Sequence, residues 1–332
     1  MTVVPPKIAP EKPQLMGGPT AGIFLIIGAM FCISINDVLI KSLSGDYPLH
    51  QIVMVRSSIG LMISLVIVQF EGGWSILRTK RPGMHALRAS MMVFANMAYF
   101  MALAVLPLAD TTALFFVAPL FTTVLSIPVL KESVGIRRIA AVLVGFLGVL
   151  IILGPGSETR PIGVSIWVMV LPVVGALAYA MTQVLTRALR MSAKASAMAV
   201  YIQCTFIVVG IGFYLVAGDG RFVEGVDNQS LQFLLRAWVW PAREDLWALI
   251  FLGLMSAVIG YTLSQAYRLG DAATIAPYEY ATMPFALFWG WIVFGSWPGI
   301  NTGIGIGLII ASGIYVFLRE RARKSSNSEG SP

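Results

Sequence analysis

Residues 108–133 have the sequence LADTTALFFVAPLFTTVLSIPVLKES. Within it, Thr111–Leu130 carries no charged residue and is bounded by Asp110 and Lys131. An α-helix needs about 20 mostly apolar residues to cross the hydrocarbon core of a bilayer. The stretch therefore predicts a transmembrane helix, because lipid cannot satisfy the backbone groups of an open strand edge.

Similar stretches recur along the whole chain. Its 332 residues are 57% hydrophobic and only 12% charged, whereas a soluble domain carries roughly 25% charged residues. We find ten candidate spans: Thr20–Ile40, Ile52–Phe70, Met84–Val105, Thr111–Leu130, Ile136–Leu153, Val164–Leu185, Ala195–Val216, Leu246–Ala266, Ala272–Phe294 and Gly303–Leu318. The predicted fold class is an all-α integral membrane protein with ten transmembrane helices.

The basic residues predict the orientation of these spans. With a cytoplasmic N-terminus, 17 of the 23 Lys and Arg residues lie on the cytoplasmic side, 5 lie outside, and Arg56 lies within the membrane. Because positively charged loops favour the cytoplasm, we expect a multi-pass protein of a bacterial-type inner (plasma) membrane. Both termini, residues 1–19 and 320–332, are predicted to be cytoplasmic tails, with disorder expected over Met1–Gln14 and Lys324–Pro332.

The net charge of +7 does not indicate nucleic-acid binding. A nucleic-acid-binding protein gathers its basic residues on one face of a folded domain, whereas here they are scattered between apolar runs. The predicted partners are therefore the lipid bilayer and a small molecule. One connection is long, the outer loop 217–245. Its segment Leu231–Trp240 predicts a short interfacial helix, with a flexible loop as the alternative.

The two halves of the chain resemble each other. Leu108–Asp110 precedes the fourth predicted helix and Leu269–Asp271 precedes the ninth, and each following helix has a proline near its middle, Pro119 or Pro284. We therefore predict a first five-helix repeat over residues 20–154 and a second over 163–319.

Five is an odd number of spans, so the second copy of the repeat starts on the opposite side of the membrane from the first. The two copies are therefore inverted relative to each other. Inverted repeats are common in secondary transporters, which bind substrate where the halves meet near mid-membrane. Chance similarity between glycine-rich apolar segments is the alternative interpretation.

The chain resembles the drug/metabolite transporter superfamily, in its ten-helix EamA-type branch. The resemblance rests on Ala109–Ala113, Ala118–Phe121, Lys131–Ser133 and Gly145–Leu153, and it extends over about residues 20–320. It implies secondary active transport of a small organic metabolite by alternating access, proton-coupled or by exchange. Ser296 stands where the family often has a glutamate, so no role of that acid is carried over.

The pattern Asn36-Asp37…Lys41…Pro48…Gln51…Arg56 looks like a subgroup that includes carriers proposed for riboflavin and S-adenosylmethionine. Other members of the superfamily export amino acids. The substrate and the direction of transport remain open at this point.

Three of the charged residues within predicted spans stand out. A charge at the bilayer centre costs roughly 2.5–3.5 kcal/mol on insertion scales, so Asp37, Arg56 and Glu279 are functional candidates. Asp37 and Arg56 have similar predicted depths and suit either a structural pair or, for Asp37, direct binding of substrate or a proton. Glu279 suits binding of a cationic group or a proton, with a structural hydrogen bond as the alternative.

Pro119 and Pro284 are predicted hinges. Proline cannot donate a backbone hydrogen bond, which frees the carbonyl oxygen four residues earlier, here that of Phe115 or Tyr280. The helices that contain them should line the cavity.

Polar and aromatic residues complete the predicted substrate-binding set. The pairs Tyr179/Gln183 and Tyr261/Gln265 are each one helical turn apart and therefore share a face. Aromatic rings with a few amides suit a flat or amphipathic ligand, although helix packing is the alternative for each residue. The full set is Asp37, Arg56, Asn96, Tyr99, Tyr179, Gln183, Tyr261, Gln265, Glu279 and Tyr280.

Small residues in the fifth and tenth predicted helices suit close helix contact. Gly303 and Gly307 are four apart, as are Ala141 and Gly145, a spacing that lets backbones approach. We expect a scaffold or a homodimer seam here.

The sequence shows no motif for a catalytic cofactor or metal. There is no phosphate-binding loop, and with two cysteines and two histidines no zinc site is evident. We therefore predict no cofactor, no metal and no enzyme activity. An integral-membrane enzyme, a channel or a scaffold protein is the alternative function.

Overall fold

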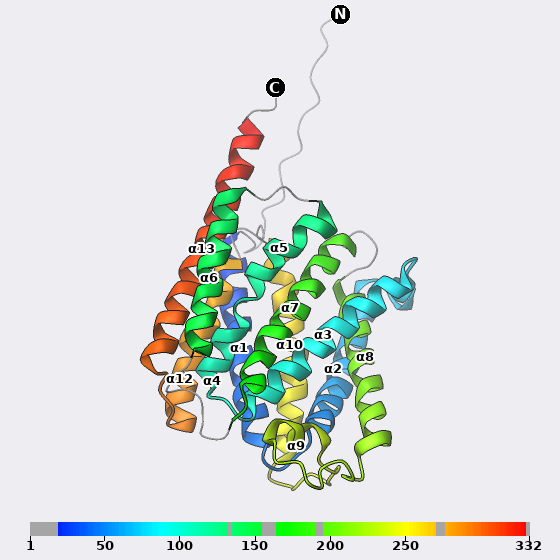
Figure 1. The fold of residues 1–332 in the computed structure, drawn as a ribbon. Coiled ribbons are helices and arrows are strands. Elements are labelled where there is room, and N and C mark those ends of the chain that lie inside the picture. The colour runs from blue at the N-terminus through cyan, green and yellow to red at the C-terminus, as the bar shows by residue number, and fades with distance from the viewer. Residues whose placement is uncertain (1–18, 132–134, 155–163, 190–194, 270–275, 330–332) are drawn as a thin grey trace, which may run out of the picture.

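The structure, a computed structural model, describes residues 19–131, 135–154, 164–189, 195–269 and 276–329. This part of the chain is helical and contains no strand (Figure 1). The first half contains α1 (Pro19–Leu43), α2 (Leu49–Glu71), η1 (Trp74–Leu77), α3 (Pro82–Leu103), α4 (Leu108–Phe115), α5 (Ala118–Leu130) and α6 (Ile136–Leu153). The second half contains α7 (Ile166–Leu189), α8 (Ala195–Ala217), α9 (Gln229–Leu235), α10 (Leu246–Leu269), η2 (Ala276–Ala281), α12 (Thr282–Phe294) and α13 (Ile300–Glu329).

Eight segments of the described chain are long and apolar enough to cross a membrane. They are α1, α2, α3, the α4–α5 segment, α7, α8, α10 and α13. Two shorter apolar elements, α6 and α12, lie between them in sequence. The protein is therefore an all-α membrane protein, as predicted from composition, while the count of ten spans stays a prediction.

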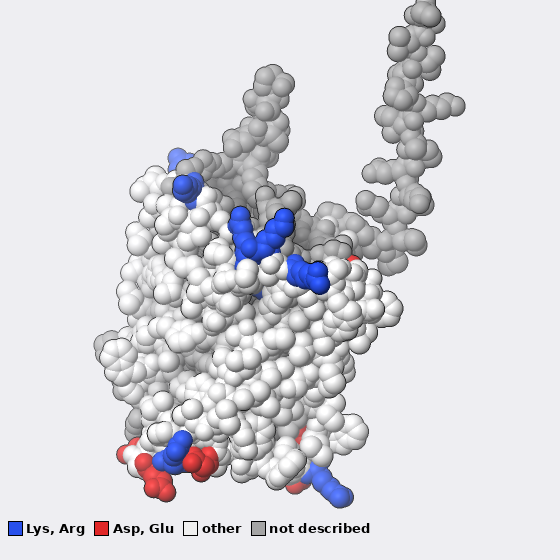
Figure 2. All heavy atoms as spheres, turned by 90° about the vertical axis from the view of Figure 1, so that its right-hand side faces the viewer, with Lys and Arg blue, Asp and Glu red and all other residues white. Residues whose placement is uncertain are grey.

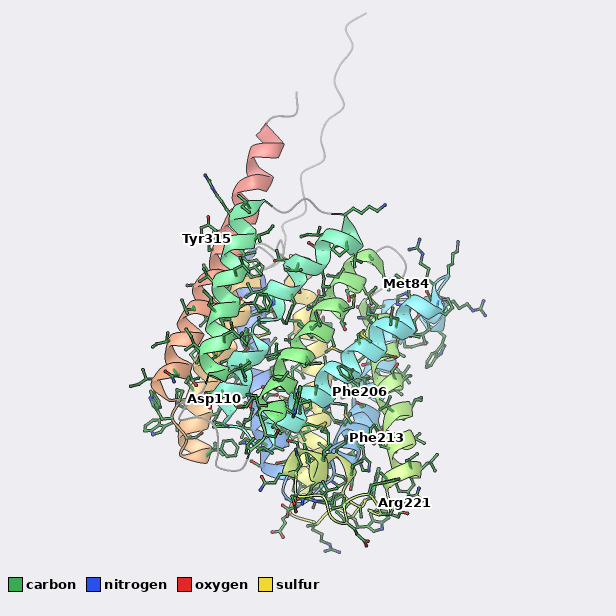
Figure 3. All side chains as sticks on the ribbon, viewed as in Figure 1. Met84, Asp110, Phe206, Phe213, Arg221 and Tyr315 are labelled. Atoms are coloured by element: carbon green, nitrogen blue, oxygen red, sulfur yellow. The ribbon has the colours of Figure 1, made fainter. Side chains whose placement is uncertain are left out.

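The helices form one bundle with two distinct ends (Figure 1). The start of α1 and the end of α13 lie at one end, here called the terminal end. At the opposite end, here called the α9 end, α9 packs against α2 and α3. Met84 lies toward the terminal end and Arg221 at the α9 end, with Phe206 between them (Figure 3).

Helix packing follows a regular scheme. The most extensive contacts join α3 with α7, α1 with α10, α6 with α13 and α2 with α8, and α4 packs on α12. Glycines allow the closest approaches: a Cβ atom on Gly148 of α6 would lie 2.8 Å from the carbonyl oxygen of Gly305 on α13. The backbones of α6 and α13 are therefore in direct contact.

The glycines predicted as a scaffold or dimer seam have two different environments. Gly145 faces Leu120 and Ser312 within the chain, whereas a Cβ atom on Gly303 or Gly307 would meet nothing within 4 Å. Gly145 therefore belongs to the internal scaffold, and a dimer through Gly303 and Gly307 remains a prediction.

The fourth predicted helix is divided in two. α4 ends at Phe115 and α5 begins at Ala118, within a single membrane span. Pro119 has no N–H to donate to Phe115, and the chain turns instead through a bond from the Leu120 N–H to the Val117 carbonyl at 3.0 Å. The break lies where the proline predicted a weak point, although the sequence analysis treated Thr111–Leu130 as continuous.

The ninth predicted helix also differs from the expectation. Residues 276–281 form the 3₁₀ segment η2, and Pro284 lies in the first turn of α12 and not near the middle of a helix. A proline is readily accommodated in the first turn, where backbone N–H groups lack helical partners in any case. The start of the predicted span, residues 272–275, lies outside the described residues.

Two further expectations are corrected. The predicted helix Leu231–Trp240 is displaced: α9 spans Gln229–Leu235, because the Asn228 side chain caps it by accepting hydrogen bonds from the Ser230 and Leu231 N–H groups. The C-terminal segment expected to lack structure continues α13 to Glu329. Its sequence after Leu318, RERARK, consists of good helix formers. The predicted N-terminal tail lies outside the described residues except for Pro19.

The surface of the bundle separates apolar and charged residues. On the face shown in Figure 2, the described Lys, Arg, Asp and Glu side chains gather at the two ends and leave the middle uncharged. Large apolar side chains such as Phe24, Val208 and Leu215 are exposed. This pattern is that of a lipid-facing band.

Candidate functional site

A cavity of about 470 Å³ occupies the centre of the bundle. Its walls come from α1, α2, α3, α7, α8 and α10, together with the α4–α5 break and η2. It begins at the terminal end, where Glu71, Thr186 and Ser196 line it, and extends to Asp37, Tyr99 and Thr112. The cavity therefore extends from the terminal end deep into the bundle, where residues of α1, α3 and α4 line it.

Most residues of the predicted substrate-binding set face this cavity. The lining residues include Asp37, Arg56, Asn96, Tyr99, Tyr179, Gln183, Tyr261, Gln265 and Glu279, and also Pro119. Tyr280 and Pro284 are not among them. Glu279 and Tyr280 face different sides because they are consecutive residues of the 3₁₀ segment η2. The sequence does not show which of the two faces the cavity.

Asp37 lies in a hydrogen-bonded group at the deep end of the cavity. Its Oδ2 accepts a hydrogen bond from the Tyr99 hydroxyl at 2.9 Å, and its Oδ1 lies 3.4 Å from the Asn36 amide nitrogen. The Tyr99 hydroxyl is also 3.2 Å from the Thr112 hydroxyl. Through these contacts Asp37 joins α1, α3 and α4.

Arg56 is buried beside this group. Its guanidinium lies 5.5 Å from the ring centre of Phe100 and 5.4 Å from that of Phe206, which are cation–π distances. Its Nη2 is 3.5 Å from the Asn96 oxygen, and its Nε has no hydrogen-bond partner. Asp37 acts on Arg56 electrostatically, and the two share no hydrogen bond. An unsatisfied donor on a buried cation that faces a cavity suits an acceptor atom of a ligand.

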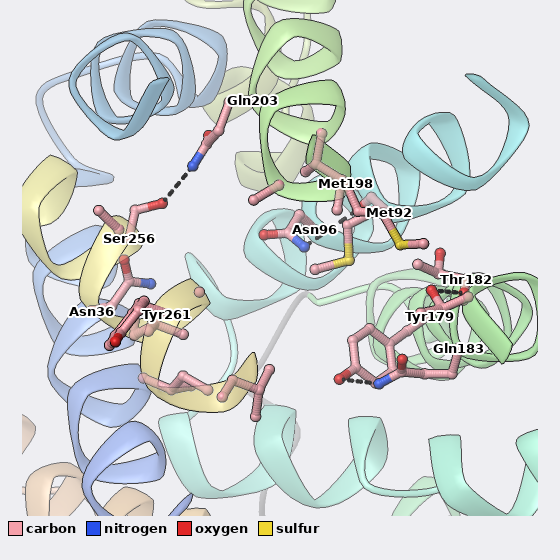
Figure 4. Close-up of a pocket in the computed structure, with 18 of the residues that line it drawn as sticks. Asn36, Met92, Asn96, Tyr179, Thr182, Gln183, Met198, Gln203, Ser256 and Tyr261 are labelled. Carbon is pink, nitrogen blue, oxygen red and sulfur yellow. Dashed lines mark hydrogen bonds between the residues drawn. The ribbon is translucent and has the colours of Figure 1, made fainter. Parts of the chain in front are cut away.

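The predicted polar pairs lie on the cavity wall as internally bonded pairs. Gln183 donates to the Tyr179 hydroxyl at 2.8 Å, and Gln265 donates to the Tyr261 hydroxyl at 3.0 Å. Tyr179 also packs on Phe115 beside the α4–α5 break. Figure 4 shows the Tyr179 pair and Tyr261 on different walls of the pocket.

Sequence reasoning missed several polar lining residues. Gln203 of α8 donates to the Ser256 hydroxyl of α10 at 3.2 Å (Figure 4). Arg88, expected on the cytoplasmic side, lines the cavity near the terminal end and donates to the Met198 carbonyl at 2.8 Å. A polar residue within an apolar run was the available signal for Gln203, but its partner on another helix was not predictable.

Tyr280 has a different environment from Glu279. Its ring packs against Phe116 at 5.2 Å between centres. Its hydroxyl occupies the space left by Gly313 of α13, where a Cβ atom would collide with it. Tyr280 therefore fixes η2 to the scaffold helix α13, and Glu279, in the preceding position, faces the cavity.

The cavity is closed at the α9 end by two groups of hydrogen bonds, here together called the α9 seal. In the first, the Lys41 ammonium donates to the carbonyl oxygens of Leu103 and Leu106, both at 2.7 Å. These carbonyls belong to the end of α3 and the turn after it, where helical partners are missing. Lys41 therefore ties α1 to the end of α3.

The second group joins the turn between α1 and α2 to the chain around α9. Gln51 donates to the Val239 carbonyl at 2.6 Å and accepts from the Val239 N–H at 3.2 Å. Tyr47 donates to Asp245 at 2.6 Å, and Arg236 donates to the carbonyls of Ser44 and Gly45. All these bonds connect segments distant in sequence and cover the end of the bundle.

No metal site is evident in the described part of the chain. No group of three or more His, Cys, Asp or Glu residues is arranged there to hold a metal ion. The described helices instead surround a central, partly polar cavity. A cavity of this kind within an apolar helical bundle is typical of membrane transporters.

The comparisons with known proteins agree with that class. The model of the EamA-like transporter family matches residues 20–154. The chain is 24% identical over 308 residues to an S-adenosylmethionine uptake transporter of Rickettsia prowazekii, covering 93% of this chain and 96% of the relative. It is 27% identical over 307 residues to a riboflavin transporter of Vibrio cholerae, covering 92% and 94%. The chain is therefore similar to EamA-like transporters over residues 20–154 and to bacterial metabolite transporters over most of its length.

A solved crystal structure supports the fold independently. It superposes with a TM-score of 0.61 at 17% identity, over 92% of this chain and 98% of the other. At this identity the similarity concerns the fold alone.

Proposed function

We propose that this protein carries a small organic metabolite across a bacterial inner membrane by alternating access between two inverted five-helix halves. The single observation that carries the proposal is the cavity at the centre of the bundle, which begins at one end and is closed at the other. A carrier must present its binding site to one side at a time, and a cavity of this form suits one such state.

The packing scheme supports two inverted halves, residues 20–154 and 163–319. Counting predicted spans, α1 corresponds to α7 and α3 to α10. The contact of α3 with α7 then corresponds to that of α10 with α1, and both occur. The pairs α2–α8, α4–α12 and α6–α13 each join corresponding elements and also occur. Exchange of the halves therefore preserves the main contacts of a ten-span bundle.

The charge distribution supports a cytoplasmic terminal end. The loops predicted for that side contain most Lys and Arg residues, and cytoplasmic loops are enriched in them. In this orientation the structure is inward-open, and the α9 seal closes the outer side. The outward-open state requires the seal to break and the terminal end to close.

The cavity chemistry supports an organic substrate with both aromatic and polar parts. Arg56 offers a free Nε donor between two phenyl rings, and Asp37 offers a carboxyl nearby. Amide pairs such as Tyr179–Gln183 offer further hydrogen bonds. The named relatives transport S-adenosylmethionine or riboflavin, so these two compounds are the first substrates to test.

The hinge proposal rests on the α4–α5 break and on η2. Both interrupt regular α-helix beside the cavity, where Phe115 and Glu279 line it. A break that leaves backbone groups unpaired lets the two parts of a helix move separately. Rocking of the halves is therefore proposed to bend the chain at Pro119 and near Pro284.

Counterflow in liposomes tests the proposal. Purified full-length protein is reconstituted, the vesicles are loaded with unlabelled riboflavin or S-adenosylmethionine, and entry of the same labelled compound is followed. A carrier gives transient, saturable accumulation of the labelled compound above its equilibrium level. Matched vesicles that contain the protein but no unlabelled compound should lack this accumulation. Flux that does not saturate and shows no counterflow would indicate a channel, and chemical conversion of the compound would indicate an enzyme.

A further inference from the structure

Asp110 is a buried carboxyl group that the cavity does not use. It lies in the first turn of α4, with 1% of its surface exposed, and is not among the cavity-lining residues. Neither Oδ1 nor Oδ2 has a hydrogen-bond partner. Figure 3 shows it on α4, at about the level of Phe206 along the bundle.

Thr302 of α13 faces Asp110 across the contact between the two predicted halves. It is fully buried, with 0% of its surface exposed, and its hydroxyl also lacks a hydrogen-bond partner. The hydroxyl lies beside the Asp110 carboxyl, just outside hydrogen-bonding geometry. Two unsatisfied polar groups of complementary type therefore meet between α4 and α13.

No described side chain forms an ion pair or hydrogen bond with the Asp110 carboxyl. The elements that pack against α4 are α3, α6, α7, α12 and α13, and α12 has no titratable residue. In the others, the described titratable side chains lie toward the terminal end or have another partner. The first group is His85, Arg88, Arg137 and Tyr315, and the second is Tyr99, bonded to Asp37, and Tyr179, bonded to Gln183.

An ionised carboxylate in this environment is costly. Moving a charged group out of water costs several kcal/mol in a real protein unless hydrogen bonds or an opposite charge compensate it. A neutral carboxylic acid costs much less, and its O–H donates to a hydroxyl such as that of Thr302 after a small rotation. A divalent metal cation requires about six oxygen ligands, whereas no group of three or more His, Cys, Asp or Glu side chains gathers around Asp110 in the described part of the chain. The chemistry therefore favours a proton.

We propose that Asp110 is a proton-binding site between the two halves of the protein, occupied while α4 and α13 pack together and emptied when they separate. In the exchange, a hydronium ion transfers its proton to a carboxylate oxygen of Asp110 and leaves water, and the reverse step restores the carboxylate. The link between this exchange and substrate movement rests on the proposed transport function. Proton occupancy then favours the state in which the α9 end is closed.

Infrared spectroscopy tests the proton site without a substrate. In pH-difference spectra of the reconstituted protein, we expect a carboxylic-acid carbonyl band that is lost in Asp110→Asn. Thr302→Val should move this band to higher frequency, because the acid loses its hydrogen-bond partner. Asp46→Asn, which changes an exposed carboxyl in the α1–α2 turn, is the matched control and should retain the band.

Spectra of the wild type and Asp110→Asn that agree over the whole pH range would overturn the proposal. If Asp110→Asn does not fold, an unmoved band in Thr302→Val overturns it equally. A band that responds to sodium at constant pH, and not to pH, would identify a metal-cation site and also contradict it.

Transport measurements test the coupling separately. With a substrate identified by counterflow, a pH gradient should drive accumulation in the wild type, and Asp110→Asn should lose that accumulation while retaining counterflow exchange. Loss of both activities would indicate damage to the carrier, and retention of gradient-driven accumulation would exclude coupling through Asp110. Absence of any transport in the wild type would contradict the proposed function and leave the infrared result standing on its own.

Discussion

The two ends of the cavity differ in how the helices are joined. At the α9 end, Lys41, Tyr47 and Gln51 make hydrogen bonds to segments far away in sequence, and several of the acceptors are backbone carbonyls. Along the open cavity, the pairs Tyr179–Gln183 and Tyr261–Gln265 bond within single helices. A helix that satisfies its polar groups internally moves without breaking bonds to its neighbours. Because Gln203–Ser256 and Arg88–Met198 also join different helices along the cavity, we expect the seal to contribute part of the energy barrier between the two proposed states.

The largest expected effect on transport concerns Asp37 at the deep end of the cavity, the part of the cavity nearest to the α9 seal. Asp37→Asn replaces the charged acceptor of the Tyr99 hydrogen bond and removes the charge that acts on Arg56. A hydrogen bond to a charged group contributes about 1.5–3 kcal/mol, so substrate counterflow should fall roughly 10-fold to 100-fold. This decrease is measured by comparing the initial counterflow rates of Asp37→Asn and the wild type at equal protein content.

Asp46→Asn is the control for this variant, because Asp46 is exposed in the turn that follows α1. If Asp37→Asn transports as fast as the wild type in a well-folded protein, Asp37 has no direct role. If the double swap Asp37→Arg/Arg56→Asp restores both folding and transport, the pair is a structural clamp only.

The next effect concerns the first part of the α9 seal. Lys41→Met leaves the carbonyls of Leu103 and Leu106 without their charged donor. We expect the closed α9 end to be destabilised by about 3–6 kcal/mol, since each of the two charge-assisted hydrogen bonds is worth about 1.5–3 kcal/mol. Amide hydrogen exchange at the end of α3 and in the α1–α2 turn should become faster, because Lys41 ties these two segments together.

Lys80→Met is the control, since Lys80 is exposed in the connection before α3 at the other end of the bundle. Equal exchange at the α9 end in Lys41→Met and in the wild type would show that Lys41 does not hold the seal. Faster exchange throughout the molecule would indicate general unfolding instead.

How far the sequence predicted these regions depends on the kind of interaction. The membrane spans were predictable because apolar length is a local property, and the break before Pro119 followed from its missing N–H group. Polar residues inside apolar runs pointed to the cavity, and Asp37, Arg56 and Glu279 all line it. Whether these residues bind substrate stays a proposal.

The seal was not predictable from the sequence for a physical reason. Lys41 and Gln51 bind backbone carbonyls, and every residue has a carbonyl, so no residue type marks the partner. The helical continuation of α13 and the placement of Pro284 in the first turn of α12 likewise depend on neighbouring elements. Tertiary contacts decide such boundaries more than local propensity does.

A smaller effect is expected from the second part of the seal. Gln51→Leu removes both hydrogen bonds to Val239 and leaves the N–H and C=O of that residue without their partner. Because a neutral hydrogen bond contributes about 0.5–1.5 kcal/mol, loss of the two together should destabilise the closed α9 end by about 1–3 kcal/mol. Hydrogen exchange should accelerate around Val239 and leave the end of α3 unchanged.

Gln69→Leu is the matched control, on the exposed face near the opposite end of the same helix. An acceleration that also reaches Leu103 and Leu106 would mean that the two parts of the seal open as one unit. That outcome would change the comparison of the two ends, since the seal would then behave as a single gate.

The smallest effect is expected from Arg236, the partly exposed member of the α9 seal. Arg236 donates to the carbonyls of Ser44 and Gly45 but is partly exposed, so water replaces these bonds at little cost. Arg236→Ala should destabilise the closed state by only about 0.5–1 kcal/mol, visible as slightly faster exchange of the α1–α2 turn. Arg243→Ala, at an exposed position of the same loop, should leave that exchange rate unchanged. A larger effect of Arg236→Ala than of Lys41→Met would reverse this order, because Arg236 and not the buried Lys41 ammonium would then hold the α9 end closed.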